Sequence, residues 1–258
     1  MLHGCTQSPD DFAAGTRMNQ LAEERGLVIG EGSPRSRCWS PALNQFQHFE
    51  QFAEAGCSGY VIAGITREVL RDHRLDPARV YVAGLSSGGA AAATMASTYP
   101  DLYAAVGVHS GLAHGAASDV MSAFSAMSRG GRPGSGRASP APRVDLVPTI
   151  VFHGDRDTTV HPSNADHVLA QARAGAPGPL AATIERGQAP GGLAYTRTVY
   201  AAAGHGEHHP LLEQWVVHGA GHAWSGGSSA GSYTEPRGPD AGREMLRFFL
   251  AQRHPTAR

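Results

Sequence analysis

The segment Gly84-Leu85-Ser86-Ser87-Gly88 has the pattern Gly-x-Ser-x-Gly, which places a serine hydroxyl between two glycines. An apolar run at residues 80–83 precedes it and is typical of a buried strand, and a run of small residues at 89–93 is typical of a closely packed helix. A sharp strand-to-helix turn exposes the serine at the start of the helix, where it can act as a nucleophile. In a glycine-rich chain the pattern alone also fits an ordinary turn. The prediction that Ser86 is the nucleophile therefore depends on the strand expected before it and the helix expected after it.

A serine nucleophile needs a histidine that takes its proton and a carboxylate that orients the histidine. The strand-like run at 149–152 leads into a turn that holds two acids, Asp155 and Asp157. We expect Asp157 to be the catalytic acid because it lies further past the strand. Asp155 is better placed to close the turn by accepting hydrogen bonds from backbone N–H groups.

Two histidines follow the next strand-like run, at 214–217. His222 lies in a glycine-rich loop and is free to reach Ser86, whereas His218 is still at the strand end, where a structural histidine is expected. We therefore predict that His222 is the base. Carboxyl ends of parallel strands meet at one edge of a sheet, so Ser86, Asp157 and His222 can converge there.

The remaining histidines have simpler interpretations. The cluster His205-Gly206-Glu207-His208-His209 contains potential metal ligands, but it falls in a polar turn and lacks the helical i, i+4 spacing of a zinc motif. We expect a solvated turn there and no metal. His109 and His161 lie near the expected edge of the site and could line it.

Strand and helix patterns alternate along the chain, which predicts an α/β fold with a doubly wound, mostly parallel sheet. No linker separates two cores, so we expect a single domain over residues 1–258. Stretches at 128–143 and 175–193 are poor in large apolar side chains and are expected to be flexible insertions. The expected strands are 27–29, 79–83, 104–108, 149–152 and a hairpin of 195–200 with 214–217; the expected helices are 9–25, 61–73, 87–97, 118–127, 162–173 and 239–252.

Composition excludes several classes of protein. Lys and Arg together number 21, all of them Arg, which rules out lysine Schiff-base chemistry and the phosphate-binding loop that requires lysine. The net charge is -1 and no basic run is present, which disfavours nucleic-acid binding. No segment approaches the ~20 apolar residues of a membrane span. The three cysteines, Cys5, Cys38 and Cys57, contain no Cys-x-x-Cys pair, and either one disulfide or three thiols fits them.

Five motifs in a fixed order resemble the polyhydroxybutyrate depolymerase-type esterases, α/β-hydrolases related to the feruloyl and acetylxylan esterases. They are LHGCTQ at 2–7, CW at 38–39, GLSSGG at 84–89, HGDRDTTVHP at 153–162 and GAGHAWSGG at 219–227. The resemblance covers nearly the whole chain. It implies an α/β-hydrolase fold and an exported, extracellular protein. It also implies that further strands precede the LHGC motif, which stands at the start of this chain.

The same resemblance implies a catalytic triad of Ser86, Asp157 and His222. It implies that the backbone N–H groups of Cys5 and Ser87 form the oxyanion hole, with no metal or organic cofactor. This agrees with the general rule that the residue after the nucleophile and an early loop stabilise the oxyanion.

Trp39, Trp224 and Tyr233 are expected to frame the substrate site, although each tryptophan fits a place in the core equally well. We expect hydrolysis of short-chain esters or 3-hydroxybutyrate oligoesters, with no nucleic-acid or membrane partner. One alternative is a feruloyl or acetylxylan esterase. Another, from a different class, is a non-catalytic polyester- or glycan-binding hydrolase fold.

Overall fold

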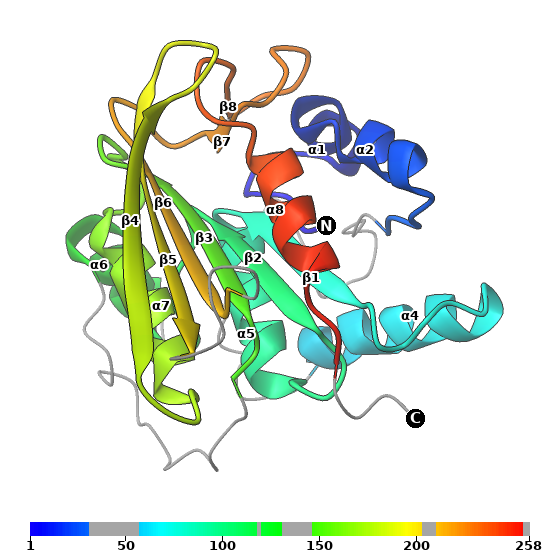
Figure 1. The fold of residues 1–258 in the computed structure, drawn as a ribbon. Coiled ribbons are helices and arrows are strands. Elements are labelled where there is room, and N and C mark those ends of the chain that lie inside the picture. The colour runs from blue at the N-terminus through cyan, green and yellow to red at the C-terminus, as the bar shows by residue number, and fades with distance from the viewer. Residues whose placement is uncertain (31–56, 118–119, 131–145, 203–209, 255–258) are drawn as a thin grey trace.

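The computed structural model describes residues 1–30, 57–117, 120–130, 146–202 and 210–254. Within these ranges the central feature is a six-stranded sheet in the order β1-β2-β3-β6-β5-β4 (Figure 1). Strands β1, β2, β3 and β6 are parallel, while β5 and β4 add an antiparallel edge. The strands are β1 (Tyr81–Leu85), β2 (Ala105–His109), β3 (Thr149–Gly154), β4 (Leu180–Gln188), β5 (Ala194–Ala202) and β6 (Leu212–Val217). A mostly parallel sheet is thus confirmed.

Helices cover both faces of this sheet, because the central strands are apolar on both sides. One face packs against α5 and α7, and the other packs against α8 (Figure 1). Within β1 the alternation is direct: Val82 joins the first core and Ala83 joins the second. The helices are α1 (Pro9–Thr16), α2 (Met18–Arg25), α4 (Cys57–Asp72), α5 (Ser87–Thr98), α6 (Val120–Arg129), α7 (Ser163–Ala174) and α8 (Ala241–Leu250).

The first helical segment is broken in two, where the sequence predicts one helix over 9–25. Ser8 caps α1 as expected, since its Oγ accepts the Asp11 N–H at 3.2 Å. Arg17 then takes a left-handed conformation, with φ 56°, and α2 starts at the next residue. The Arg17 guanidinium donates to the Gly226 carbonyl at 2.9 Å, so a tertiary contact accompanies the break.

Two other expectations are wrong. Residues 27–29 form no strand; Leu27 and Ile29 are instead partly buried against a cluster of Met18, Leu21 and Leu246. The stretch 175–193 is not a loose insertion, because it contains β4, which pairs along its whole length with β5. As an exposed edge strand, β4 needs backbone pairing rather than an apolar face, and so its sequence gives no strand signal. The β5–β6 hairpin is confirmed.

In the other predicted insertion, 128–143, residues 128–129 end α6 and residues 131–143 lie outside the described residues. A small sheet of β7 (Trp224–Ser225) and β8 (Thr234–Glu235) lies above the carboxyl edge of the main sheet, near α1 (Figure 1). Across the described ranges, no helix combines the length and the apolar character that a membrane crossing requires.

Candidate active site

Ser86 occupies a strained turn between β1 and α5. Its φ of 58° and ψ of -119° lie outside the regions that a serine normally adopts. A Cβ at Gly84 would clash with the backbone of Gly88, and one at Gly88 would clash with the backbone of Leu2. Leu2 lies beside β1, where its N–H donates to Ala83 O at 2.8 Å. The two glycines of the motif are therefore sterically required, as the strand-to-helix interpretation predicts.

Asp157, in the turn after β3, is fully buried and accepts hydrogen bonds through both carboxylate oxygens. Oδ1 accepts the N–H groups of Thr159 at 2.9 Å and Val160 at 2.8 Å. Oδ2 accepts His222 Nδ1–H at 2.7 Å. Burial alone would raise the pKa of this carboxyl, but hydrogen bonds from His153, His222 and the backbone hold the pKa far below its usual range. Asp157 is therefore ionised.

An ionised carboxylate can only accept a hydrogen bond, so it fixes the tautomer of its partner. His222 therefore carries a proton on Nδ1, and its neutral imidazole has the lone pair on Nε2. An imidazole in this state can take a proton from a neighbouring hydroxyl. The structure thus brings together the acid and the histidine that the sequence favoured.

His153, at the end of β3, is a further neighbour of the carboxylate that sequence reasoning did not single out. Its Nε2–H donates to Val160 O at 2.8 Å and lies 3.3 Å from Asp157 Oδ2. Its ring is buried, and Nδ1 has no hydrogen-bond partner among the residues that the structure describes. In the sequence, the feature that could have identified His153 is its place at the end of a buried strand, two residues before Asp155.

His109 lies in the core rather than at the edge of the site. Its carbonyl accepts the Ser86 N–H at 2.9 Å, and its Nε2 accepts the Ser225 N–H at 3.0 Å. Burial lowers the pKa of His109 well below its ordinary value, so the ring is neutral and Nδ1–H donates to Ser110 Oγ. His109 therefore connects the turn at Ser86 to the segment that follows His222.

Trp224 stacks on this histidine, with ring centroids 5.1 Å apart, and is 1% exposed. Phe12 meets the edge of the same indole at 5.5 Å. The prediction that Trp224 faces substrate is therefore wrong, because the ring fills the space between α1 and the sheet. Trp39, also predicted to line the site, lies outside the described residues.

Tyr233 lies at the surface of the site and is 47% exposed. Its ring centroid is 6.4 Å from that of His222, and its hydroxyl is 3.2 Å from Thr6 Oγ1. The tyrosine thus spans the distance between the histidine loop and the turn at Gly4 and Cys5.

That turn packs against Ser86, since a Cβ at Gly4 would lie 3.4 Å from Ser86 Cβ. Gln7 holds it in place: its Oε1 accepts the Gly4 N–H at 3.0 Å, and its Nε2 donates to Asp11 Oδ2 at 3.0 Å. Ser87 is the first residue of α5, and the first N–H groups of a helix have no partner within it. Both predicted oxyanion residues, Cys5 and Ser87, therefore lie beside Ser86.

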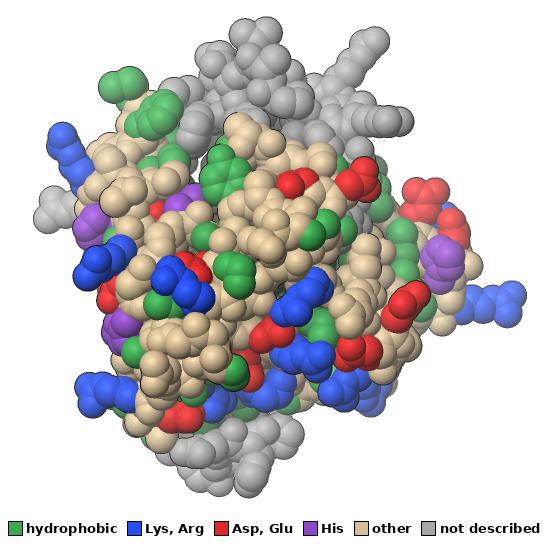
Figure 2. All heavy atoms as spheres, turned by 90° about the horizontal axis from the view of Figure 1, so that it is seen from above, with side chains coloured by type: hydrophobic (Ala, Val, Ile, Leu, Met, Phe, Trp, Pro, Cys, Tyr) green, Lys and Arg blue, Asp and Glu red, His purple; other side chains and the backbone are tan. Residues whose placement is uncertain are grey.

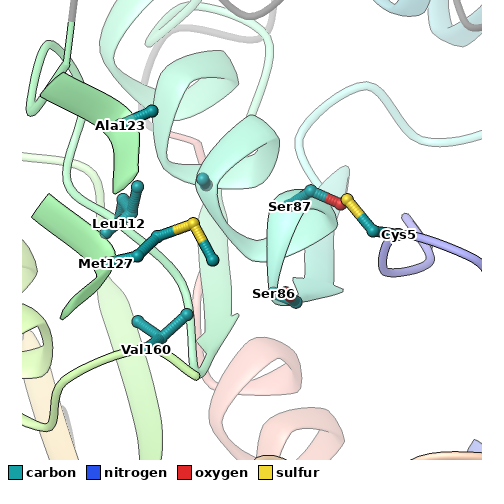
Figure 3. Close-up of a pocket in the computed structure, with 8 residues that line it drawn as sticks. Cys5, Ser86, Ser87, Leu112, Ala123, Met127 and Val160 are labelled. Atoms are coloured by element: carbon teal, nitrogen blue, oxygen red, sulfur yellow. The ribbon is translucent and has the colours of Figure 1, made fainter. Parts of the chain in front are cut away.

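A small apolar pocket opens next to these residues (Figure 3). The free thiol of Cys5 faces the Ser87 side chain on one side, and burial raises the pKa of this thiol. The Met127 side chain reaches in from α6 on the opposite side. The pocket has a volume of about 30 Å³ and is lined by Cys5, Ser86, Ser87, Ala90, Leu112, Ala123, Met127 and Val160.

Asp155 and His218, which were not predicted to be catalytic, form a separate pair. Asp155 Oδ1 accepts the Gly219 N–H at 2.7 Å, and Oδ2 accepts His218 Nδ1–H at 2.8 Å. Asp155 thus bonds a backbone N–H, as expected of a residue that closes a turn. His161 is also outside the pocket lining and bonds Ser163 Oγ at 2.8 Å.

The histidine cluster at 205–209 lies outside the described residues. Among the residues with described positions, no group of three His, Cys, Asp or Glu side chains could hold a metal ion.

Figure 2 looks onto the side of the molecule that is uppermost in Figure 1, where β7 and β8 lie. Basic and acidic side chains are mixed along one margin, and hydrophobic side chains are scattered among polar residues elsewhere. Mixed signs produce only a weak long-range field.

Comparison with known proteins gives a consistent result. The chain is 26% identical over 185 residues to a probable acetylxylan esterase A of Aspergillus clavatus, covering 63% of this chain and 56% of that protein. It is 28% identical over 186 residues to the poly(3-hydroxyalkanoate) depolymerase C of Paucimonas lemoignei, covering 66% and 42% respectively. The chain therefore spans about half the length of the curated relatives it matches.

Among solved structures, an acetyl xylan esterase from Aspergillus awamori superposes with a TM-score of 0.64 at 20% identity, covering 97% of this chain and 87% of that one. This likeness shows the fold, which is that of the α/β-hydrolases. The family described as Esterase PHB depolymerase matches residues 1–187. On that match, the chain belongs to the Esterase PHB depolymerase family.

Proposed function

We propose that this protein is a serine carboxylic-ester hydrolase with Ser86 as nucleophile, His222 as base and Asp157 as acid. The observation that carries the proposal is the buried Asp157–His222 pair, 2.7 Å apart, in a chain that also holds Ser86 in a strained turn at the same edge of the sheet. The fixed Nδ1–H tautomer supplies the lone pair that a general base requires.

In the proposed reaction, Ser86 Oγ attacks the ester carbonyl while His222 Nε2 takes its proton. The N–H groups of Cys5 and Ser87 stabilise the oxyanion that forms. His222 then protonates the leaving alcohol, which leaves an acyl group on Ser86. Water, deprotonated by the same histidine, releases the acid. Each step uses only groups of this chain and water, with no cofactor.

The size of the pocket beside Ser86 supports small acyl groups. A cavity of about 30 Å³ has room for two or three water-sized groups, since one water needs roughly 10–15 Å³. An acetyl group matches this size, whereas the ring and propenoyl arm of a feruloyl group exceed it. The substrates we propose are short-chain esters and 3-hydroxybutyrate oligoesters, with acetylated polysaccharide as the nearest alternative. Both agree with relatives that are named as depolymerase and acetylxylan esterase.

We further propose that Tyr233 contacts the substrate, because it is half exposed beside His222. By its resemblance to exported family members, the enzyme is proposed to act outside the cell.

Replacing Ser86 with alanine tests the proposal. The variant should lose at least about 10⁴-fold in turnover of 4-nitrophenyl acetate and should no longer react with a fluorophosphonate. Ser97→Ala, later on the same helix α5, is the matched control and should keep both properties. Near-normal activity in Ser86→Ala would refute the assignment. If the unmodified protein is inactive but binds polyester or glycan, the non-catalytic alternative holds.

A comparison of substrates tests the acyl group. Hydroxybutyrate trimer, acetylated xylan and methyl ferulate are presented at equal concentrations to the unmodified enzyme. We expect the first two to be hydrolysed faster than methyl ferulate. A clear preference for methyl ferulate would contradict the argument from the pocket volume without affecting the assignment of Ser86.

A further inference from the structure

A second array of hydroxyl, imidazole and carboxylate lies outside the proposed active site. His218 Nδ1 is 2.8 Å from Asp155 Oδ2, and His218 Nε2 is 2.9 Å from Thr196 Oγ1. Burial alone would raise the pKa of Asp155, but hydrogen bonds from His218 and Gly219 hold it below its usual value. The ionised carboxylate can only accept, so His218 carries its proton on Nδ1. In the neutral imidazole the Thr196 hydroxyl therefore donates to the Nε2 lone pair.

The backbone fixes all three side chains. Thr196 lies on β5 opposite Val216 of β6, and the His218 N–H continues this pairing by donating to Ala194 O at 2.8 Å. Asp155 is held from the other side because its Oδ1 accepts the Gly219 N–H at 2.7 Å. A hydroxyl, a base and an orienting acid that are all positioned by hydrogen bonds are preorganised for proton transfer.

Closing the turn does not require this imidazole. The bond from Gly219 N–H to Asp155 and a bond from the Arg156 N–H to Ala220 O, 3.0 Å long, already join the turn after β3 to the loop after β6. The His218 side chain is 42% exposed and that of Asp155 is 38% exposed, so a small acyl donor can approach them from solvent.

We propose that Thr196 is a second acyl acceptor of this protein, acylated by short activated esters with His218 as general base and Asp155 as its orienting acid. Thr196 Oγ bonds to the ester carbonyl carbon, and its proton passes to His218 Nε2. The bond from that carbon to the leaving oxygen breaks, and the alkoxide or phenolate leaves with the electron pair. His218 then gives its proton to the leaving group or to water, and an ester remains on Thr196. The proposal does not depend on Ser86.

The test uses the full chain with Ser86→Ala, so that hydrolysis at the first site does not consume the reagent. After exposure to 4-nitrophenyl acetate, trypsin cleaves after Arg186 and Arg197 and releases the peptide that contains Tyr195 and Thr196. Fragmentation of that peptide locates the acetyl group. Thr198, two residues along β5 and opposite Gln214 rather than beside His218, is an internal control in the same molecule.

We expect acetylation of Thr196 to be about 10²-fold faster than that of Thr198, the lower end of the contribution of a general base. Adding His218→Gln should reduce the Thr196 rate to that of Thr198, and adding Asp155→Asn should reduce it in part. Circular dichroism and the thermal midpoint show whether each variant is folded. Equal rates at the two threonines in Ser86→Ala would overturn the proposal, and this comparison needs no further variant. A Thr196 rate that folded His218→Gln leaves unchanged, or acetyl found on Tyr195 alone, would overturn it as well.

Discussion

Asparagine at position 157 should reverse the tautomer of His222. Asp157 Oδ1 accepts two backbone N–H groups, from Thr159 and Val160, so the amide oxygen of an asparagine must take that position. Its NH₂ group then replaces Oδ2, which lies 2.7 Å from His222 Nδ1. Because NH₂ donates and cannot accept, Nδ1 must lose its proton to Nε2. An imidazole protonated on Nε2 cannot take the proton of Ser86.

The expected cost follows from this exchange. A wrong tautomer in a serine–histidine–aspartate triad lowers kcat by about 10⁴-fold, which corresponds to about 5 kcal/mol of transition-state stabilisation. Asparagine has nearly the shape of aspartate and keeps both backbone hydrogen bonds, so Asp157→Asn should still fold. The assay is the initial rate of 4-nitrophenyl acetate hydrolysis at near-neutral pH, with circular dichroism to confirm folding.

Asp155→Asn is the matched control, because Asp155 lies two residues earlier in the same turn and has its own histidine. Loss of its charged bond to His218 should lower stability by about 1 kcal/mol and leave kcat within a few fold. If folded Asp157→Asn kept more than about a tenth of normal kcat, or if the two variants behaved in the opposite way, the assignment of the acid would be wrong.

Three further outcomes are expected. His153→Phe removes the donor to Val160 O and a donor near Asp157 Oδ2, so the free energy of unfolding should fall by about 1–3 kcal/mol in a denaturant titration; an unchanged stability would contradict this role. Met127→Ala enlarges the pocket and should raise the ratio of kcat/KM for butyrate esters to that for acetate esters. The expected increase is about fourfold for each additional CH₂ that the pocket accommodates, because burying one CH₂ contributes ~0.8 kcal/mol. An unchanged ratio would mean that the acyl group binds elsewhere. The pKa of Asp155 is lowered in the folded protein, so its ionised form stabilises the fold above the ordinary carboxyl pKa near 4, and this contribution is lost as the pH falls below that value. The difference in thermal midpoint between wild type and Asp155→Asn should therefore shrink between about pH 6 and about pH 3. A difference that stays constant over this range would contradict the reasoning.

The turn at Ser86 could be predicted from sequence because its steric demands are local. Gly84 and Gly88 face backbone at distances that exclude any side chain, and the apolar run before them and the small residues after them specify the strand and the helix. Few other sequences satisfy all of these demands at once. The parallel strands β1, β2 and β3 were predictable for a related reason, since a strand buried on both faces is a continuous apolar run.

Other features depend on partners that lie far away in the sequence. The edge strand β4 is polar and largely exposed, and only its backbone pairing with β5 identifies it. The apolar side chains of Leu27 and Ile29 looked like a strand but are buried by helices. A tryptophan such as Trp224 can serve equally well in a core or in a binding site. Its place in the core is determined by contacts with Phe12 and His109, which lie more than a hundred positions earlier in the chain.

The pairing of each acid with its own histidine is also a tertiary property, and it explains why one pair is suited to catalysis. The Arg156 N–H bonds Ala220 O, so the turn and the loop are joined at their midpoints. Asp155 and His218 lie on the outer side of this connection and Asp157 and His222 on the inner side, so an exchange of partners would require the connection to break. The outer carboxylate shares its charge with water, which weakens its effect on the imidazole. The inner carboxylate is fully buried, so water screens its charge less, and in the proposed reaction it can stabilise the imidazolium that forms when His222 takes the Ser86 proton.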